Sequence, residues 1–230
     1  MIVRQTTALF IDAYRELNAK KLFWITMILS LLVVVVFAMT GVNDTGVSFL
    51  IWTIPGTDAF AAMIDPAMWY KFLFIAFGIG TWLTWVATIL ALISTAGIFP
   101  DLLSSGSIDL VLSKPISRLR LFLTKYLTGL LFAALQVFVF SGASFLVIGI
   151  RGGDWEPRIL LAVPIVVTFF SYLFGICVLI GVITRSTIAS LLLTLLVWFF
   201  FFIVNVTDAA FLGQKAEREF GVEFNETWVA

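Results

Sequence analysis

Residues 159–207 read ILLAVPIVVTFFSYLFGICVLIGVITRSTIASLLLTLLVWFFFFIVNVT, and Arg185 is the single charged residue among them. The uncharged runs on either side of Arg185 contain 26 and 22 residues. A helix needs about 20 apolar residues to cross a hydrocarbon core of about 30 Å, so each run is long enough for one crossing. The stretch therefore predicts two transmembrane helices joined by a tight turn.

Three earlier parts of the chain have the same character. Uncharged runs of 22, 29 and 25 residues occupy 22–43, 72–100 and 126–150. They are rich in Leu, Ile, Val and Phe and do not alternate with polar residues, which argues against a porin-like barrel. Because backbone groups in lipid must be hydrogen-bonded internally, we expect helices. The five predicted spans are about 22–41, 70–99, 126–149, 159–183 and 187–206.

The overall composition is typical of a protein that is solvated by lipid. The 230 residues are 61% hydrophobic and 12% charged, whereas a soluble domain carries about 25% charged residues. No internal repeat, linker or low-complexity segment divides the chain. The sequence therefore predicts an all-α integral membrane protein with a single membrane domain over residues 1–230.

Several kinds of chemistry are excluded by the residue types present. The chain has no histidine, which removes His-ligated haem, His-ligated metal sites and His-based acid–base catalysis. Its one cysteine, Cys177, cannot form an internal disulfide, and its apolar surroundings indicate a packed thiol. The net charge is zero, without the basic excess of a nucleic-acid-binding protein. We therefore expect no catalytic residue, no cofactor or metal site on this chain, and no nucleic-acid partner.

The five runs contain no charged side chain. Intramembrane charges are costly and are generally kept for function, so their absence argues against a proton pump, a voltage sensor or an ion-coupled carrier. The Ser, Thr and Gln residues in the runs are expected to make helix–helix contacts rather than to bind a substrate. The phosphate-binding motif G-x-x-x-x-G-K-[ST] is absent as well. If the protein moves a substrate, the energy must come from a partner.

The distribution of positive charge predicts the orientation. With a cytoplasmic N-terminus, nine of the fourteen Lys and Arg residues face the cytoplasm, as the positive-inside rule requires. Residues 1–21 then lie in the cytoplasm, where Phe10, Ala13, Tyr14 and Leu17 have helical spacing. We expect an interfacial amphipathic helix there, although a solvated, positively charged flank is the alternative.

The same orientation places DLLSSGSIDLVLSKPISRLR, residues 101–120, in the cytoplasm between the second and third spans. Ser107 can cap a short helix over 108–112. That helix would stop at Lys114, because the following Pro115 disfavours helical geometry in the residue before it. Exposed apolar groups on a polar loop are usually covered by a partner, and contact with lipid headgroups or neighbouring spans is the alternative.

The wider stretch GIFPDLLSSGSIDLVLSKPISRLRLFLTKYLTGL, residues 97–130, resembles the ATP-binding-cassette (ABC) type 2 permeases, especially the branch grouped with multicopper-enzyme maturation permeases. The order of the predicted segments along the chain is also similar to that family. The resemblance implies a coupling helix that docks on a separate nucleotide-binding ATPase subunit, which would hold ATP and Mg. The implied docking residues are Ser107, Ile108, Asp109, Leu110, Val111, Leu112, Ser113, Lys114, Pro115 and Arg118.

The resemblance further implies a transporter subunit rather than an enzyme. We expect an exporter, formed by a homodimer or heterodimer of permeases in a bacterial cytoplasmic (inner) membrane. Family members commonly carry an acidic residue near the end of the second span, where this chain has Asp101. The family usually has six spans, so the tail 207–230 is expected to be an external segment that stops before a sixth. The alternative function is a non-transporting membrane scaffold that recruits a cytosolic protein through the same loop.

Overall fold

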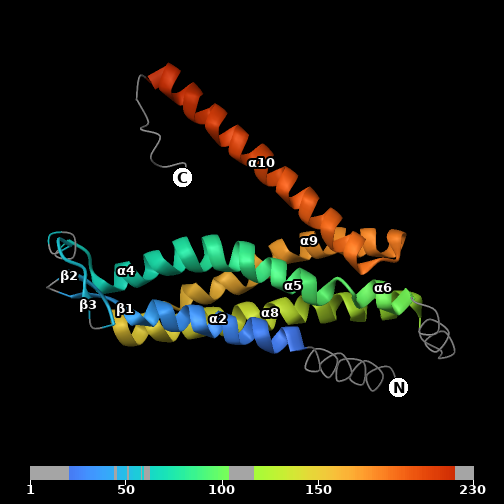
Figure 1. The fold of residues 1–230 in the computed structure, drawn as a ribbon, viewed down its shortest axis with the longest axis horizontal. Helices are drawn as coiled ribbons and strands as arrows, with labels where there is room; N and C mark the ends of the chain where they lie inside the picture. The colour runs from blue at the N-terminus through green and yellow to red at the C-terminus, as the bar shows by residue number, and fades with distance from the viewer. Residues whose placement is uncertain are drawn as a thin grey trace.

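The prediction of an all-α membrane protein is confirmed by the computed structural model (Figure 1). Among the described residues, five helices are long and apolar enough to cross a membrane. The structure describes residues 21–43, 46–50, 52–57, 59, 63–103 and 117–220. An interfacial helix is predicted within residues 1–21; all of these except Lys21, and the segment 104–116, lie outside the described residues.

Most of the helices extend beyond the uncharged runs from which they were predicted, but the first helix ends before the predicted span end at 41, because residues 40–43 form a strand. The first crossing is α2 (Lys21–Met39). The second is built from α4 (Pro66–Leu73), η1 (Phe74–Ala87), α5 (Thr88–Thr95) and α6 (Ile98–Leu103). The third is α8 (Arg118–Gly152), and the fourth combines η2 (Pro157–Leu161) with α9 (Ala162–Thr184). The fifth helix, α10 (Thr187–Phe220), continues past the predicted span end at 206.

The second crossing is widened in its middle part. Over its 14 residues, η1 is a π-helix, in which carbonyls accept from groups five residues further on rather than four. The Thr84 and Thr88 hydroxyls follow the same spacing, because they donate to the carbonyls of Ile79 and Leu83 at 2.7 Å each. These two hydroxyls are thus satisfied within their own helix, whereas the Ser171 hydroxyl makes the predicted kind of contact between helices, with Tyr126.

A small antiparallel sheet, which the sequence did not predict, follows the first helix. Strands β1 (Thr40–Asn43), β2 (Gly46–Phe49) and β3 (Trp52–Thr53) pair in chain order. The sheet lies at one end of the bundle, beside the start of α4 (Figure 1). We call this the sheet end, and we call the opposite end, where α9 turns into α10, the turn end.

Two buried apolar clusters fill the bundle, one in each half. The turn-end cluster consists of Phe23, Ala91, Leu92, Ala96, Ile98, Phe99, Phe132, Ala133, Phe170, Leu173, Phe174, Cys177, Val178 and Trp198. The sheet-end cluster consists of Val34, Tyr70, Leu73, Phe74, Trp82, Leu83, Ala87, Val137, Phe140, Ile148, Ile159, Ala162 and Val166. The packed thiol predicted for Cys177 is confirmed, because this residue is 1% exposed.

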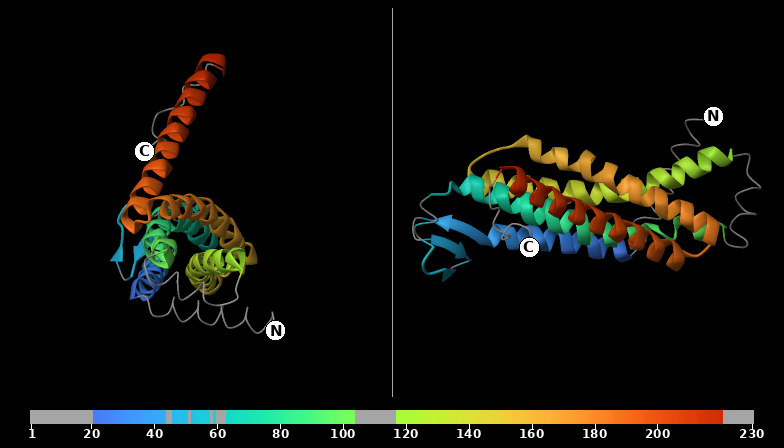
Figure 2. Two further views of the ribbon diagram at one scale, coloured as in Figure 1. Left: turned by 90° about the vertical axis from the view of Figure 1, so that its right-hand side faces the viewer. Right: turned by 90° about the horizontal axis from the view of Figure 1, so that it is seen from above.

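The last helix leaves the bundle. In Figures 1 and 2, α10 starts beside the end of α9 and then diverges from the other helices. Trp198 is its last buried residue among those described, and its ring stacks on Trp85 with 4.8 Å between centroids. Beyond it, every residue from 199 to 212 is exposed. In the most apolar 18-residue stretch of this helix, 17% of the residues are buried, whereas 44% are buried in the corresponding stretch of α8.

Candidate functional site

The predicted docking segment connects the second and third crossings. Of its residues, Ser107 to Pro115 lie outside the described part of the chain. Arg118 is described; it is the first residue of α8, and its side chain is exposed. Ser117 caps this helix by accepting a hydrogen bond from the backbone N–H of Arg120 at 3.3 Å. Asp101 lies in α6, at the end of the second crossing as expected.

The helices that flank the docking segment are joined by aromatic side chains. Phe99 of α6 contacts Phe122 of α8 with 5.1 Å between ring centroids. Phe122 stacks on Tyr126, and Tyr126 stacks on Phe174 of α9 with centroids 5.3 Å apart. The Tyr126 hydroxyl also donates to the Ser171 carbonyl at 2.9 Å. The result is a continuous aromatic contact from α6 through α8 to α9.

The turn between α9 and α10 lies beside the same helices. Arg185 adopts a left-handed conformation with φ 50° and ends α9. The side chain of Pro100 in α6 approaches Gly181 of α9, where an added Cβ would lie 3.3 Å from Pro100 Cγ. Because glycine has no Cβ, the two helices can approach closely at this point.

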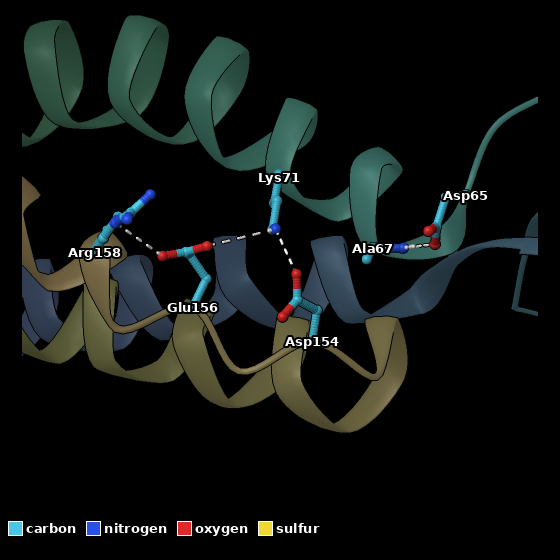
Figure 3. Close-up of polar contacts among 6 residues, drawn as sticks. All are labelled: Asp65, Ala67, Lys71, Asp154, Glu156 and Arg158. Carbon is cyan, nitrogen blue, oxygen red and sulfur yellow. Dashed lines mark hydrogen bonds and ion pairs between the residues drawn. The ribbon is translucent and has the colours of Figure 1, made fainter.

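Four charged side chains of the sheet end lie together in Figure 3: Lys71, Asp154, Glu156 and Arg158. Lys71 Nζ lies 2.6 Å from Asp154 Oδ2 and 3.8 Å from Glu156 Oε2. Arg158 Nε lies 3.6 Å from Glu156 Oε1. We call these four residues the charged cluster. It joins α4 to the segment between α8 and α9, but its side chains are partly or largely solvent-exposed, so the pairs contribute little to stability.

A buried tyrosine connects three elements at the same end. The Tyr70 hydroxyl donates to the Thr40 carbonyl at 2.6 Å and accepts from Arg151 Nε at 2.9 Å. Tyr70 itself is 4% exposed. These bonds tie the junction of α2 and β1 to α4 and to the end of α8. Trp52, Trp69 and Trp155 belong to this end too.

A groove runs inward from the charged cluster, between the second crossing and the η2–α9 segment. Its volume is about 430 Å³. Its walls are apolar and include Phe74, Ile75, Ile79, Ala162, Ile165 and Val166. Lys71, Glu156 and Arg158 line its polar end. We call this cavity the sheet-end groove.

An unpaired amide lies between the two apolar clusters. Gln136 of α8 is 1% exposed, and neither Oε1 nor Nε2 finds a hydrogen-bond partner in the described part of the chain. It faces a cavity of about 10 Å³, lined by residues of both clusters. That volume is at the lower limit for a single water molecule. Burial of the unpaired Gln136 amide therefore costs free energy at mid-bundle, and it does not form a substrate site.

The described residues contain no group of three or more acidic or cysteine side chains that could hold a metal ion. Comparison of the chain with protein-family models, with curated proteins and with solved structures finds no match. The structure therefore defines the class, an all-α membrane protein with five helices able to cross the bilayer.

Sequence reasoning missed the sheet-end groove. Lys71 and Arg158 served only to mark where apolar runs begin, although each is followed by an apolar helix. Glu156 and Arg158 flank Pro157, which starts η2. Two cations at the starts of two apolar helices that run in the same direction could have indicated a polar end between those helices. What the sequence could not give was the distance between those helices.

Proposed function

We propose that this chain is the membrane-spanning permease subunit of an ATP-driven ABC transporter, an exporter of a bacterial cytoplasmic membrane. Its N-terminus and its turn end would face the cytoplasm. A separate nucleotide-binding subunit, which holds ATP and Mg, would dock on residues 107–118. Two permease chains, identical or different, would form the translocation path. The resemblance of residues 97–130 to this family motivates the proposal.

The position of the charged residues supports an external energy source. No Asp, Glu, Lys or Arg occurs between Lys71 and Asp101, between Lys125 and Arg151, or between Arg158 and Arg185. The middle of each of these crossings therefore offers no side chain that could relay a proton or pair with a coupling cation. A transporter of this composition needs a partner that converts chemical energy.

The observation that carries the proposal is the contact between Phe99 and Phe122. These residues lie on the two helices that flank the docking segment, and they join those helices to each other. Through Tyr126 and Phe174 the contact continues to α9. A force applied to the segment by closure of an ATPase dimer would therefore displace α6, α8 and α9 together, because packed side chains transmit small shifts as rigid bodies.

The docking assignment is tested with Leu110→Asp and Leu112→Asp. The chain is co-expressed with candidate nucleotide-binding subunits, beginning with any P-loop ATPase encoded in an adjacent reading frame, and is purified by its own tag. Each substitution places a charge where an apolar contact is expected, so co-purification of the ATPase should be lost. Met63→Asp is the matched control, because Met63 is 86% exposed and precedes α4 at the sheet end. Unchanged binding by both docking variants would refute the assignment.

Vanadate-sensitive ATP hydrolysis in lipid separates the transporter from the scaffold. For a permease, the chain should stimulate hydrolysis by its bound ATPase, and Phe122→Ala should reduce that stimulation while leaving co-purification intact. The scaffold alternative predicts binding of a cytosolic protein with no effect of the chain on hydrolysis.

A further inference from the structure

The sheet-end groove has the dimensions of one membrane leaflet. Its wall runs along the second crossing from Lys71 to Ile79, which is roughly 12 Å of helix. The opposite wall, from Arg158 to Val166, has a similar length. Half of a hydrocarbon core measures about 15 Å. A groove of this length that starts at the membrane interface would reach most of the way to the bilayer midplane.

The groove is open to the surrounding lipid. Ile75 and Ile165, on opposite walls, are 63% and 67% exposed. The floor is formed by buried members of the sheet-end cluster, among them Phe74 and Val166. A volume of about 430 Å³ lies within the range of small-molecule sites. The shape suits a flexible apolar chain that enters sideways from the membrane.

The polar end offers charges of both signs. The charged cluster contains two cations, Lys71 and Arg158, and two carboxylates, Asp154 and Glu156, so it has no net charge. Lys71 is occupied by its 2.6 Å contact with Asp154. The Arg158 side chain is 85% exposed and uses Nε for its ion pair, so its terminal nitrogens have no partner among the described residues. In Figure 3 its guanidinium extends toward the helix that carries Lys71.

We propose that the sheet-end groove binds one zwitterionic phospholipid of the surrounding leaflet. One acyl chain lies along Ile75, Ile79 and Ile165. The phosphate is held by the terminal nitrogens of Arg158, because a guanidinium forms strong paired hydrogen bonds with phosphate oxygens. The headgroup ammonium lies against Glu156. A lipid with only negative charge could pair with Arg158 but would bring no cation to Glu156, so the zwitterion is favoured.

The inference concerns retention at a defined site, which distinguishes it from the exchangeable lipid around any membrane protein. It does not depend on the ATPase partner. A helix from a second copy of the chain is the competing occupant, but a helix is about 10 Å wide and would have to pass the charged cluster with an apolar face. A single acyl chain matches the groove without that cost.

Native mass spectrometry of the full chain, delipidated in detergent, tests the site. Phosphatidylethanolamine and phosphatidylglycerol are titrated separately, and the one-lipid complex is followed. Arg158→Gln removes the phosphate contact, and Ile165→Trp fills the groove from its exposed wall. Ile188→Trp is the control, because Ile188 is 73% exposed at the start of α10, outside the groove.

The expected result is one retained phosphatidylethanolamine per chain. Arg158→Gln and Ile165→Trp should each weaken this complex by about tenfold, the loss expected for one charge-assisted hydrogen bond or an equivalent contact, while Ile188→Trp leaves it unchanged. If all variants retain the lipid equally, the lipid belongs to the exchangeable shell around the protein, and the proposal is overturned. Stronger retention of phosphatidylglycerol would overturn the headgroup assignment. If the chain forms a lipid-free dimer that Ile165→Trp disrupts, a second copy of the chain occupies the groove, and the lipid proposal is overturned.

Discussion

At the turn end, α9 lies directly against α6 and α8. At the sheet end, the same crossing contacts η1 only at the floor of the groove, and the groove separates their outer faces. The close contacts occur over glycines: a Cβ added to Gly129 would lie 2.5 Å from the Phe174 ring, and one added to Gly181 would lie 3.3 Å from Pro100. The groove walls instead face each other with isoleucines. In a membrane, where lipid is as apolar as leucine, small residues decide which helices close on one another.

The difference also separates two kinds of structural support. The turn end is held by ring stacking and close packing around Phe174, which is fully buried. The sheet end has its own apolar cluster, in which Phe74 stacks on Phe140, and adds the directed bonds that Tyr70 makes with two other elements. The groove lies open at this end, on the face between the second crossing and α9. Substitutions at the two ends should therefore have unequal effects.

The largest effect is expected for Gly129→Ala at the turn end. The new methyl group would overlap the ring of Phe174, which cannot swing aside because it is stacked between Phe170 and Tyr126. We expect a loss of about 3 kcal/mol in unfolding free energy, the upper end for overpacking, measured by denaturant titration in mixed micelles. Gly142→Ala in the same helix has open space at its Cβ and should be neutral or slightly stabilising. Equal stability of the two variants would remove the packing difference between the ends.

A smaller effect is expected for Tyr70→Phe at the sheet end. The variant loses the hydroxyl that donates to the Thr40 carbonyl and accepts from Arg151. Loss of a buried hydrogen bond to a charged group should cost about 2 kcal/mol in the same titration. Tyr172→Phe serves as the control, because Tyr172 is 72% exposed. If both variants unfold alike, directed bonds do not hold the sheet end.

Gln136→Met, at the boundary between the clusters, should raise stability by about 1 kcal/mol. The thioether has a similar shape but no unpaired amide, so the desolvation cost of Gln136 disappears. The measurement is again the unfolding free energy in micelles. A destabilised variant would mean that the amide has a partner at mid-bundle, such as a water in the small cavity.

The smallest effect is expected for Asp154→Asn in the charged cluster. Its contact with Lys71 is short, but both side chains are partly exposed, so solvent and salt screen the interaction. The thermal unfolding temperature should change little at low salt and not at all at high salt. A large, salt-independent shift would show that the ion pair, rather than Tyr70, holds the sheet end.

The sequence predicted the five helices well because a crossing must be long and apolar, and both properties are local. The predicted third span, 126–149, is shorter than its helix at both ends, since α8 begins at Arg118 and continues to Gly152, beyond Lys125 and Arg151. Charged side chains at a membrane edge can remain helical while their ends reach water. The β1–β3 sheet was missed because its strands are short and depend on pairing with each other.

The candidate sites were predictable to different degrees. The docking residues 107–115 lie outside the described chain, so their assignment stays a prediction. Phe99 and Phe122 are separated by the whole docking segment, and their contact depends on how α6 meets α8. The groove likewise depends on the spacing between two crossings. Neither distance is encoded in local composition or periodicity.

The turn at Arg185 also has a consequence for how the protein enters the membrane during synthesis. Only Arg185 and Ser186 separate α9 from α10, too few residues to form an independent loop on either face. The two helices should therefore integrate as one antiparallel hairpin, with Arg185 at its turn. Moving or neutralising this single cation would alter the topology of two crossings at once.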